Sequence, residues 1–255
     1  MSTFKSFALV GAGGYIGKHI LKAFQTIGIN PLIITRNPSA SSFPTSLTVA
    51  SIDFDKSDNI AQLLEEHRIQ VVVSAISSSV PAEQQRHLAD AAKKAGVKVF
   101  VSSEFGLPTN GASHVAEAIV PDVHREKDQF AGMFAGYVSW LGAVEVNGKF
   151  NIEYEKDNAE VSVTHEDDIG GELENRIFRI AGENLSFEDA AKRLGQEIEY
   201  VDSVPDEGLA PEMRKALLGV IYKGRGISGW DYTIGGVQAL DNDVWARHEW
   251  RKLRL

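Results

Sequence analysis

The 255-residue chain contains no cysteine. This absence excludes disulfides, thiolate nucleophiles and cysteine-based metal sites. Positive charge is also scarce, since 26 Lys and Arg residues stand against 35 Asp and Glu residues and the formal net charge is −9 at pH 7. Because such a chain has no broad positive field to attract phosphates, we expect no direct binding to nucleic acid.

Long hydrophobic runs are missing as well. The longest apolar runs are short, such as residues 71–76 (VVVSAI), whereas a membrane-spanning helix needs about 20 apolar residues. Residues 1–10 contain too short an apolar stretch for a signal peptide. We therefore expect no membrane association and a cytoplasmic location, and the 43% of hydrophobic residues predicts a folded chain.

The first half of the chain alternates short apolar runs with segments of helical spacing. The pattern predicts helices over 15–26 and 81–95, a third helix capped by Ser57 or Asp58, and strands over 7–10, 32–35, 47–52, 71–76 and 97–102. Short apolar strands separated by helices indicate a parallel sheet covered on both faces. The predicted fold class is therefore α/β, with a doubly wound parallel Rossmann sheet whose ligands bind at the carboxyl ends of the strands.

The second half is less regular. Residues 106–122 read as a long loop, and strands are predicted over 161–164, 175–180 and 197–201. A helix is predicted from Ser186, because Ser186 and Asp189 are spaced like a capping box. The tail from Gly224 onward carries no clear pattern.

The sharpest local signal is the glycine turn at residues 11–17 (GAGGYIG), between the first predicted strand and the first helix. Glycines leave backbone N–H groups open to a pyrophosphate, and the following helix adds partial positive charge. The spacing of Gly11, Gly14 and Gly17 differs from the simple G-x-G-x-x-G fingerprint. A glycine-rich turn without a ligand is the alternative, but the flanking strand and helix favour dinucleotide binding.

The end of the second predicted strand indicates which dinucleotide is bound. Proteins that bind NAD place an acid there, whereas this strand ends with Thr35, Arg36 and Asn37. Arg36 can form a bidentate pair with a 2′-phosphate, so NADP is the predicted cofactor, the alternative being a solvated loop arginine. Asp53, after the third strand, either faces adenine or caps its own turn, and the sequence does not choose between the two.

Several segments together resemble the NmrA-like and isoflavone-reductase-like branch of the atypical short-chain dehydrogenase/reductases, in the form of its fungal members. The resemblance covers most of the chain in order, and Ser102-Ser103-Glu104-Phe105-Gly106 is its most specific piece. The matching segments are residues 10–20 (VGAGGYIGKHI), 34–37 (ITRN), 96–108 (GVKVFVSSEFGLP), 144–151 (VEVNGKFN), 161–170 (VSVTHEDDIG) and 174–182 (ENRIFRIAG).

The resemblance implies an NADP-binding Rossmann domain over residues 1–130. It also implies a smaller C-terminal substrate lobe over 131–255, partly interleaved with the sheet. No metal is expected, since His114 and His124 form no ligand set with nearby acids. The residues expected to contact the cofactor are Gly11, Gly13, Gly14, Tyr15, Ile16, Gly17, Arg36, Asp53, Ser74, Ser102 and Ser103.

Lys127 is the one catalytic candidate, and it rests on the resemblance. Enzymes of the family use a lysine just beyond the SEFG segment, and Lys127 best matches that position. An ammonium there can orient the nicotinamide ribose or polarise a substrate oxygen as hydride arrives. The alternative is a solvated helix lysine paired with Glu126 or Asp128.

The chain departs from the family pattern in two places. Lys127 is followed almost at once by the aromatic stretch at 130–134, and Asp168-Ile169-Gly170-Gly171 runs straight into the segment from Glu172. A helix and a strand expected after Lys127, and a helix after the second motif, are missing. The sequence is therefore interpreted as a member of the family with internal deletions.

Two functions from different classes are compatible with these residues. The first is an NADPH-dependent reductase of a small, aromatic or carbonyl-containing molecule. The second is a non-catalytic NADP sensor that acts through a protein partner, and an inactive truncated isoform is a third reading. The sequence identifies neither the substrate nor the oligomeric state.

Overall fold

The structure is a computed structural model that describes residues 4–37, 43–76, 82–103, 105, 129–130, 133–134, 138–164, 178–179, 181–231, 234–240, 242 and 253. The described residues fall into two compact units, the first reaching Ser103 and the second starting at Phe105. No helix in these ranges is long and apolar enough to cross a membrane.

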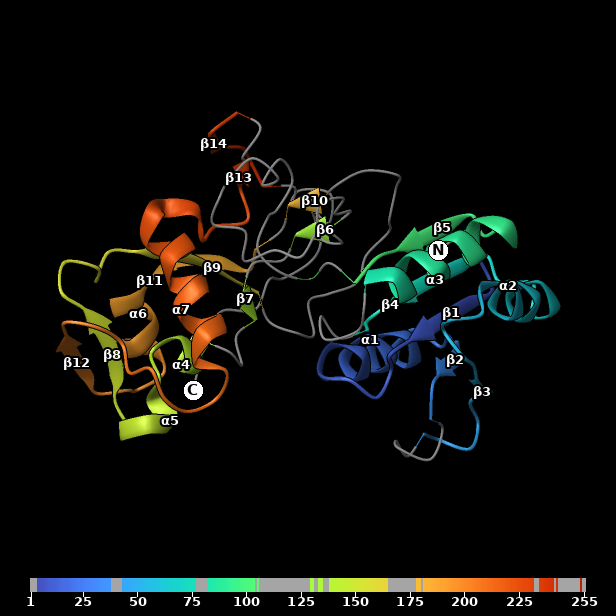
Figure 1. The fold of residues 1–255 in the computed structure, drawn as a ribbon, viewed down its shortest axis with the longest axis horizontal. Helices are drawn as coiled ribbons and strands as arrows, with labels where there is room; N and C mark the ends of the chain where they lie inside the picture. Colours follow the sequence, from blue (N-terminus) through green and yellow to red (C-terminus); the bar gives the residue numbers. More distant parts are fainter. Residues whose placement is uncertain are drawn as a thin grey trace. The chain divides into compact units, whose positions relative to one another are not determined.

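The first unit is built on a five-stranded sheet in the order β3-β2-β1-β4-β5 (Figure 1). Every neighbouring pair in this sheet is parallel. The strands are β1 (Phe7–Val10), β2 (Leu32–Thr35), β3 (Val49–Ser51), β4 (Val71–Ser74) and β5 (Val99–Val101). The predicted doubly wound α/β fold is confirmed, although β3, β4 and β5 are shorter than predicted.

Three helices cover this sheet: α1 (Tyr15–Thr26), α2 (Ser57–Glu66) and α3 (Ala82–Lys94). Helices α2 and α3 contact each other on one face, and α1 lies on the other (Figure 1). Alternate strand residues such as Val10 and Ile34 pack with Leu64 and Leu88 of α2 and α3 in one buried cluster. Strands β1, β2 and β4 are largely buried on both sides because both faces of the sheet are covered.

The predicted cap of α2 is wrong. The helix begins at Ser57 with Lys56 at its N-cap and without a side-chain cap, so neither Ser57 nor Asp58 has that role. Instead, the Asp53 carboxylate accepts from the backbone N–H of Asp55, and the N–H of Lys56 donates to the Asp53 carbonyl. This turn starts the helix one residue earlier than a Ser57 cap would.

The second unit combines short helices with several small sheets. Strand β9 (Glu160–Thr164) pairs antiparallel with β11 (Glu183–Ser186) and parallel with β7 (Met133–Phe134). Strand β8 (Phe150–Glu153) pairs parallel with β12 (Ile198–Val201). The remaining elements are α4 (Val138–Leu141), α5 (Val144–Asn147), α6 (Phe187–Arg193), α7 (Pro211–Val220), the π-helical turn η6 (Ile221–Arg225), and the pairs β6 (Gln129–Phe130) with β10 (Phe178–Arg179) and β13 (Trp230–Asp231) with β14 (Gly236–Val237).

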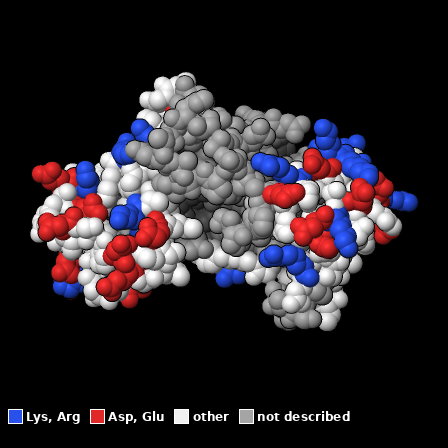
Figure 2. All heavy atoms as spheres, viewed as in Figure 1, with Lys and Arg blue, Asp and Glu red and all other residues white. Residues whose placement is uncertain are grey.

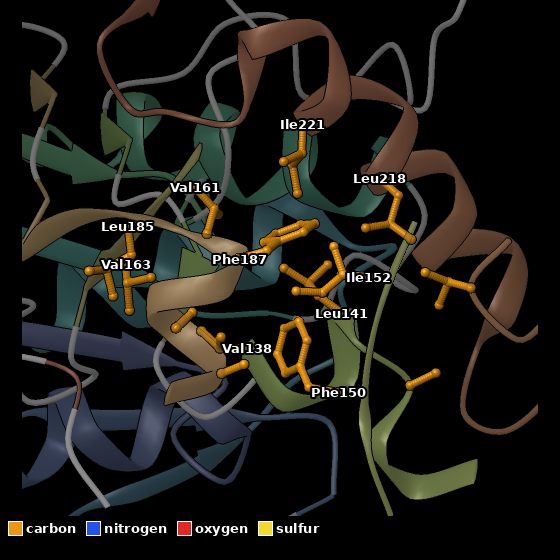
Figure 3. Packing of buried hydrophobic residues seen from close by; sticks show 14 of the residues in the cluster. Val138, Leu141, Phe150, Ile152, Val161, Val163, Leu185, Phe187, Leu218 and Ile221 are labelled. Atoms are coloured by element: carbon orange, nitrogen blue, oxygen red, sulfur yellow. The ribbon is translucent and has the colours of Figure 1, made fainter. Parts of the chain in front are cut away.

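Phe150 and Phe187 lie at the centre of the second unit's core (Figure 3). Their rings meet edge to face with centroids 6.1 Å apart, and Phe187 meets Tyr222 in the same way at 5.9 Å. Leu141 and Ile152 are fully buried around them. This cluster joins helices α4, α6 and α7 to β8.

One buried cation ties the helices of the second unit together. Arg214 of α7 is 1% exposed and donates to the Glu145 carboxylate of α5 at 2.7 Å. It also donates to the backbone carbonyls of Pro205 and Glu207. A buried guanidinium is tolerated only with such complete pairing, so this residue fixes α7 against α5 and the preceding loop.

The strands predicted over 161–164 and 197–201 are confirmed as β9 and β12. Ser186 caps α6 as predicted, because its hydroxyl accepts from the N–H of Asp189 at 3.1 Å. The strand predicted over 175–180 is described only at β10. Strands β8 and β11 and helix α7 were not predicted.

Candidate functional site

The turn after β1 is shaped so that two of its glycines cannot carry a side chain. Gly11 has φ +82°, and a Cβ there would lie 2.5 Å from the Ala75 carbonyl oxygen. A Cβ at Gly17 would lie only 2.0 Å from the Gly11 carbonyl oxygen. The turn therefore brings the start of α1 against its own strand and against the chain leaving β4.

Gly14 holds the turn closed and begins the helix. Its N–H donates to the Gly11 carbonyl at 2.9 Å, and it is the N-cap of α1. Its φ of −75° suits any residue, but a Cβ would lie 3.2 Å from the Gly11 oxygen. Gly13 and Gly14 are exposed at the tip of the turn, so their backbone is open to a ligand.

The N-terminus of α1 is prepared for an anion. No side chain caps it, and no acidic residue occurs in its first turn. Tyr15 is 38% exposed, Ile16 is half-buried, and the Lys18 ammonium lies 5.0 Å from the Tyr15 ring centroid. A helix start of this kind attracts negative charge through its N–H groups and its dipole.

Arg36 lies just beyond the end of β2 and is exposed. Its backbone carbonyl accepts from the Ser51 hydroxyl at 3.2 Å, and Thr35 accepts through its side chain from the N–H of Asn37. Within the described ranges the guanidinium makes no ion pair. The backbone is thus held while the charge stays available to a ligand.

Asp53 uses its carboxylate in its own turn. One oxygen accepts from the Asp55 N–H at 3.1 Å, and the other lies 3.7 Å from the Lys56 ammonium. This contact is the turn-capping role, one of the two expected for the residue.

Two serine hydroxyls at the carboxyl edge of the sheet are buried without a hydrogen-bond partner among the described residues: Ser74 at the end of β4 and Ser102 just after β5. The register aligns Val10 with Ser74 and Val73 with Val101, so Ser74 ends the strand next to β1 and the glycine turn, and Ser102 follows the strand beyond it. Buried polar atoms are rarely left unpaired, so these two mark a place where a ligand would complete the hydrogen bonding.

Ser103 has a different role from its neighbour. Its hydroxyl donates to the Ile76 carbonyl at 2.6 Å and so fixes the chain after β5 to the chain after β4. Ser103 therefore supports the edge on which Ser74 and Ser102 lie.

The structure brings the glycine turn, Ser74, Ser102 and Ser103 together at one edge of the sheet. Lys127 and Glu104 lie outside the described residues, as do most positions of the two expected deletions. Which of the serine hydroxyls have a hydrogen-bond partner could not be predicted from the sequence, because this depends on the register of β1, β4 and β5.

Curated relatives of the chain include oxidoreductases and reductases. Oxidoreductase aprR of Aspergillus flavus is 34% identical over 120 residues, which cover 47% of this chain and 39% of that protein. Bifunctional pinoresinol-lariciresinol reductase 2 of Thuja plicata is 28% identical over 194 residues, with 64% and 62% covered. The chain thus spans less than two thirds of the length of these two relatives.

The Thuja plicata alignment also contains positions that this chain lacks. It runs over 194 residues while using 64% of a 255-residue chain, so part of the relative has no counterpart. This agrees with the expected shortfall but does not locate it.

Solved structures share the fold along nearly the whole chain. A crystal structure of pinoresinol-lariciresinol and phenylcoumaran benzylic ether reductases superposes with a TM-score of 0.75 at 18% identity, covering 98% of this chain and 96% of that chain. The leucoanthocyanidin reductase–NADPH complex from Vitis vinifera gives 0.73 at 18% identity, with 97% and 96% covered. The model of the NmrA-like family matches residues 3–129, the part that contains the glycine turn and the five-stranded sheet, and the chain belongs to the NmrA-like family.

Proposed function

We propose that the first unit binds NADP(H) and that the chain is an NADPH-dependent reductase of a small, aromatic or carbonyl-containing molecule. The observation that carries the proposal is the side-chain-free cradle at Gly11 and Gly17, set against the uncapped start of α1. Such a cradle fits the pyrophosphate of a dinucleotide. Support for reduction comes from relatives named as reductases and from fold neighbours solved with NADP+ or NADPH.

Each part of the first unit has a task in this proposal. The N–H groups of the turn from Gly13 to Gly17 hold the pyrophosphate, and Arg36 pairs with the 2′-phosphate. The hydroxyls of Ser74 and Ser102 hydrogen-bond the cofactor where it crosses the ends of β4 and β5. NADPH, when bound, supplies the hydride.

Lys127 is the proposed catalytic residue, on the strength of the family resemblance. Its ammonium would donate a hydrogen bond to the substrate oxygen that gains negative charge as hydride arrives. Lys127→Ala should abolish turnover while leaving NADPH affinity within about threefold of wild type, because oxygen polarisation acts mainly in the transition state. Equal turnover rates in the two proteins would remove Lys127 from the mechanism.

The cofactor assignment is tested by calorimetric titration of NADPH and NADH into wild type and Arg36→Ala. A charge-assisted pair contributes about 1.5–3 kcal/mol, so the variant should lose roughly 10- to 150-fold in NADPH affinity and little in NADH affinity. Arg86→Ala is the matched control, because it removes the same charge from an exposed position of α3. Failure of wild type to bind either nucleotide would overturn the proposal.

Turnover is tested separately from binding. Wild type and NADPH are incubated with carbonyl compounds and phenylpropanoids, including pinoresinol, and NADPH oxidation is followed by absorbance. Part of the Thuja plicata reductase has no counterpart in this chain. We therefore keep a second candidate, an NADP sensor that acts through a protein partner without catalysis. Tight NADPH binding without oxidation of any substrate, together with NADP-dependent association with a partner, would support the sensor.

A further inference from the structure

A cavity of about 240 Å³ lies within the second unit. It opens between the end of β8, the loop that follows β12 and one side of α7, elements labelled in Figure 1. All of its lining residues belong to this unit, so the cavity is separate from the glycine turn and the strand ends of the first unit. Its volume lies below the range of about 300–1,000 Å³ that is typical of drug-sized ligands, so it suits a smaller molecule.

The Tyr222 hydroxyl is the unusual group in the wall. It is buried, and no side chain among the described residues hydrogen-bonds to it. Burial, together with the negative charge of Glu153, raises the pKa of Tyr222 above its usual range, so the phenol stays protonated. A buried hydroxyl without a side-chain partner keeps hydrogen-bonding capacity that a polar ligand in the cavity would use.

The charged residues around the cavity determine whether a cation or an anion would bind there. Arg214 lines the wall but is fully engaged by Glu145 and by three backbone carbonyls, so it offers no positive charge to an anion. Glu153 and Asp206 remain, against the single exposed ammonium of Lys215. Acidic side chains also gather on the face of this unit shown in Figure 2. The available charge in the wall is therefore negative.

The rest of the lining is apolar except for Ser203. Val204 and Leu218 are 7% and 4% exposed, and two prolines complete this part of the wall. Glu153 reaches the same wall, since one of its carboxylate oxygens accepts from the N–H of Val204 at 3.3 Å. An apolar surface therefore lies directly beside an acceptor.

We propose that this cavity binds a small organic cation, an ammonium group carried on a short apolar body. The ammonium donates to the Glu153 carboxylate and to the Tyr222 hydroxyl oxygen, and the apolar body packs on Val204 and Leu218. The site is independent of NADP(H), so it stands or falls separately from the proposed reductase.

The test uses butylammonium as the probe, titrated into the full chain and followed by saturation-transfer NMR. 1-Butanol and butyrate have the same apolar body with no charge and with the opposite charge. We expect butylammonium to bind at least about tenfold more tightly than either of them, because a charged hydrogen bond is worth roughly that factor. Equal binding of the three probes, or no binding of butylammonium, would overturn the proposal.

Variants locate the binding to this wall. Glu153→Gln should weaken butylammonium binding about tenfold or more, and Tyr222→Phe a few-fold without lowering the melting temperature. Glu212→Gln is the matched control, because it makes the same charge change at an exposed position of α7 outside the lining. If Glu153→Gln unfolds the chain, Tyr222→Phe still decides, and unchanged affinity in Tyr222→Phe contradicts the site.

Discussion

Removing the hydroxyl of Ser74 should stabilise the free protein and weaken its hold on NADP(H) at the same time. Ser74 is 1% exposed, and its hydroxyl has no partner in the described part of the chain. Burying an unpaired hydroxyl costs about 1–3 kcal/mol by mutational measures, and alanine fits the same space without that cost. We expect Ser74→Ala to gain about 1 kcal/mol, which raises the melting temperature of a domain of 150–250 residues by roughly 2–4 °C.

The effect on the cofactor has the opposite sign. If NADP(H) completes the hydrogen bonding of this hydroxyl, the variant loses one neutral hydrogen bond of about 0.5–1.5 kcal/mol. NADPH affinity should then fall roughly 2- to 13-fold. The melting temperatures of wild type and variant should therefore approach each other as NADPH is added.

Thermal melts with and without NADPH, together with calorimetric titration, measure both effects on one sample. Ser103→Ala is the control at the same edge, because its hydroxyl donates to the Ile76 carbonyl and its removal should lower the melting temperature. A lower melting temperature in free Ser74→Ala would refute the view that its hydroxyl is unpaired. Unchanged NADPH affinity would refute its contact with the cofactor.

Three further changes have definite expected outcomes. Gly17→Ala should abolish NADPH binding in calorimetry, because its Cβ would lie 2.0 Å from the Gly11 oxygen and force the turn open, whereas Gly14→Ala, with a nearest contact of 3.2 Å, should remain folded. Ser186→Ala should lower the free energy of unfolding in urea by about 1 kcal/mol, since it removes the cap of α6. Glu145→Ala should cost about 3 kcal/mol in the same assay, the low end for a buried charge left without its counter-ion, because Arg214 keeps three carbonyl partners; a loss below about 1 kcal/mol would contradict the role given to Arg214.

The first unit was readable from sequence because its signals are local. Each strand is a continuous apolar run, and Gly28 and Gly96, both with positive φ, follow α1 and α3. The cap of α2 was missed because the side chain of Asp53, four residues before the helix, shapes the turn. Local composition therefore locates elements well and their first residues less well.

The second unit was harder to predict because buried polar residues interrupt the apolar pattern of its elements, Asn151 in β8 and Arg214 in α7 among them. Asn151 in β8 is 1% exposed and donates to the Gly142 carbonyl at 2.8 Å, which disguises the strand as a polar segment. Arg214 does the same for α7, since a charge occupies a buried position of the helix. Both residues are tolerated because hydrogen-bond partners outside their own element satisfy them, and the apolar periodicity of an element does not reveal such partners.

Part of the candidate site could likewise be located from local sequence, and part depends on contacts across the sheet. The glycine turn and Arg36 could be predicted because their spacing to a strand end is itself the signal. The distinction between Ser74, Ser102 and Ser103 could not, because it depends on which carbonyl each hydroxyl meets across the sheet. The roles of the glycine turn, of Arg36 and of the three serines as cofactor contacts all stay predictions, as does that of Lys127.

Because Gly11 lies so close to the Ala75 carbonyl, nucleotide affinity should depend on how β1 and β4 are aligned. The Ala75 N–H donates to the Val10 carbonyl at 2.8 Å, and the Ala75 carbonyl is the group that a Cβ at Gly11 would meet. The residue that makes the last hydrogen bond between β1 and β4 therefore also packs against the glycine turn. A shift of Ala75 by a fraction of an ångström would change the shape of the phosphate-binding turn, even though the strands remain paired. Core substitutions far along β1 or β4 should therefore reveal themselves as weakened nucleotide binding while the protein still melts as a folded chain.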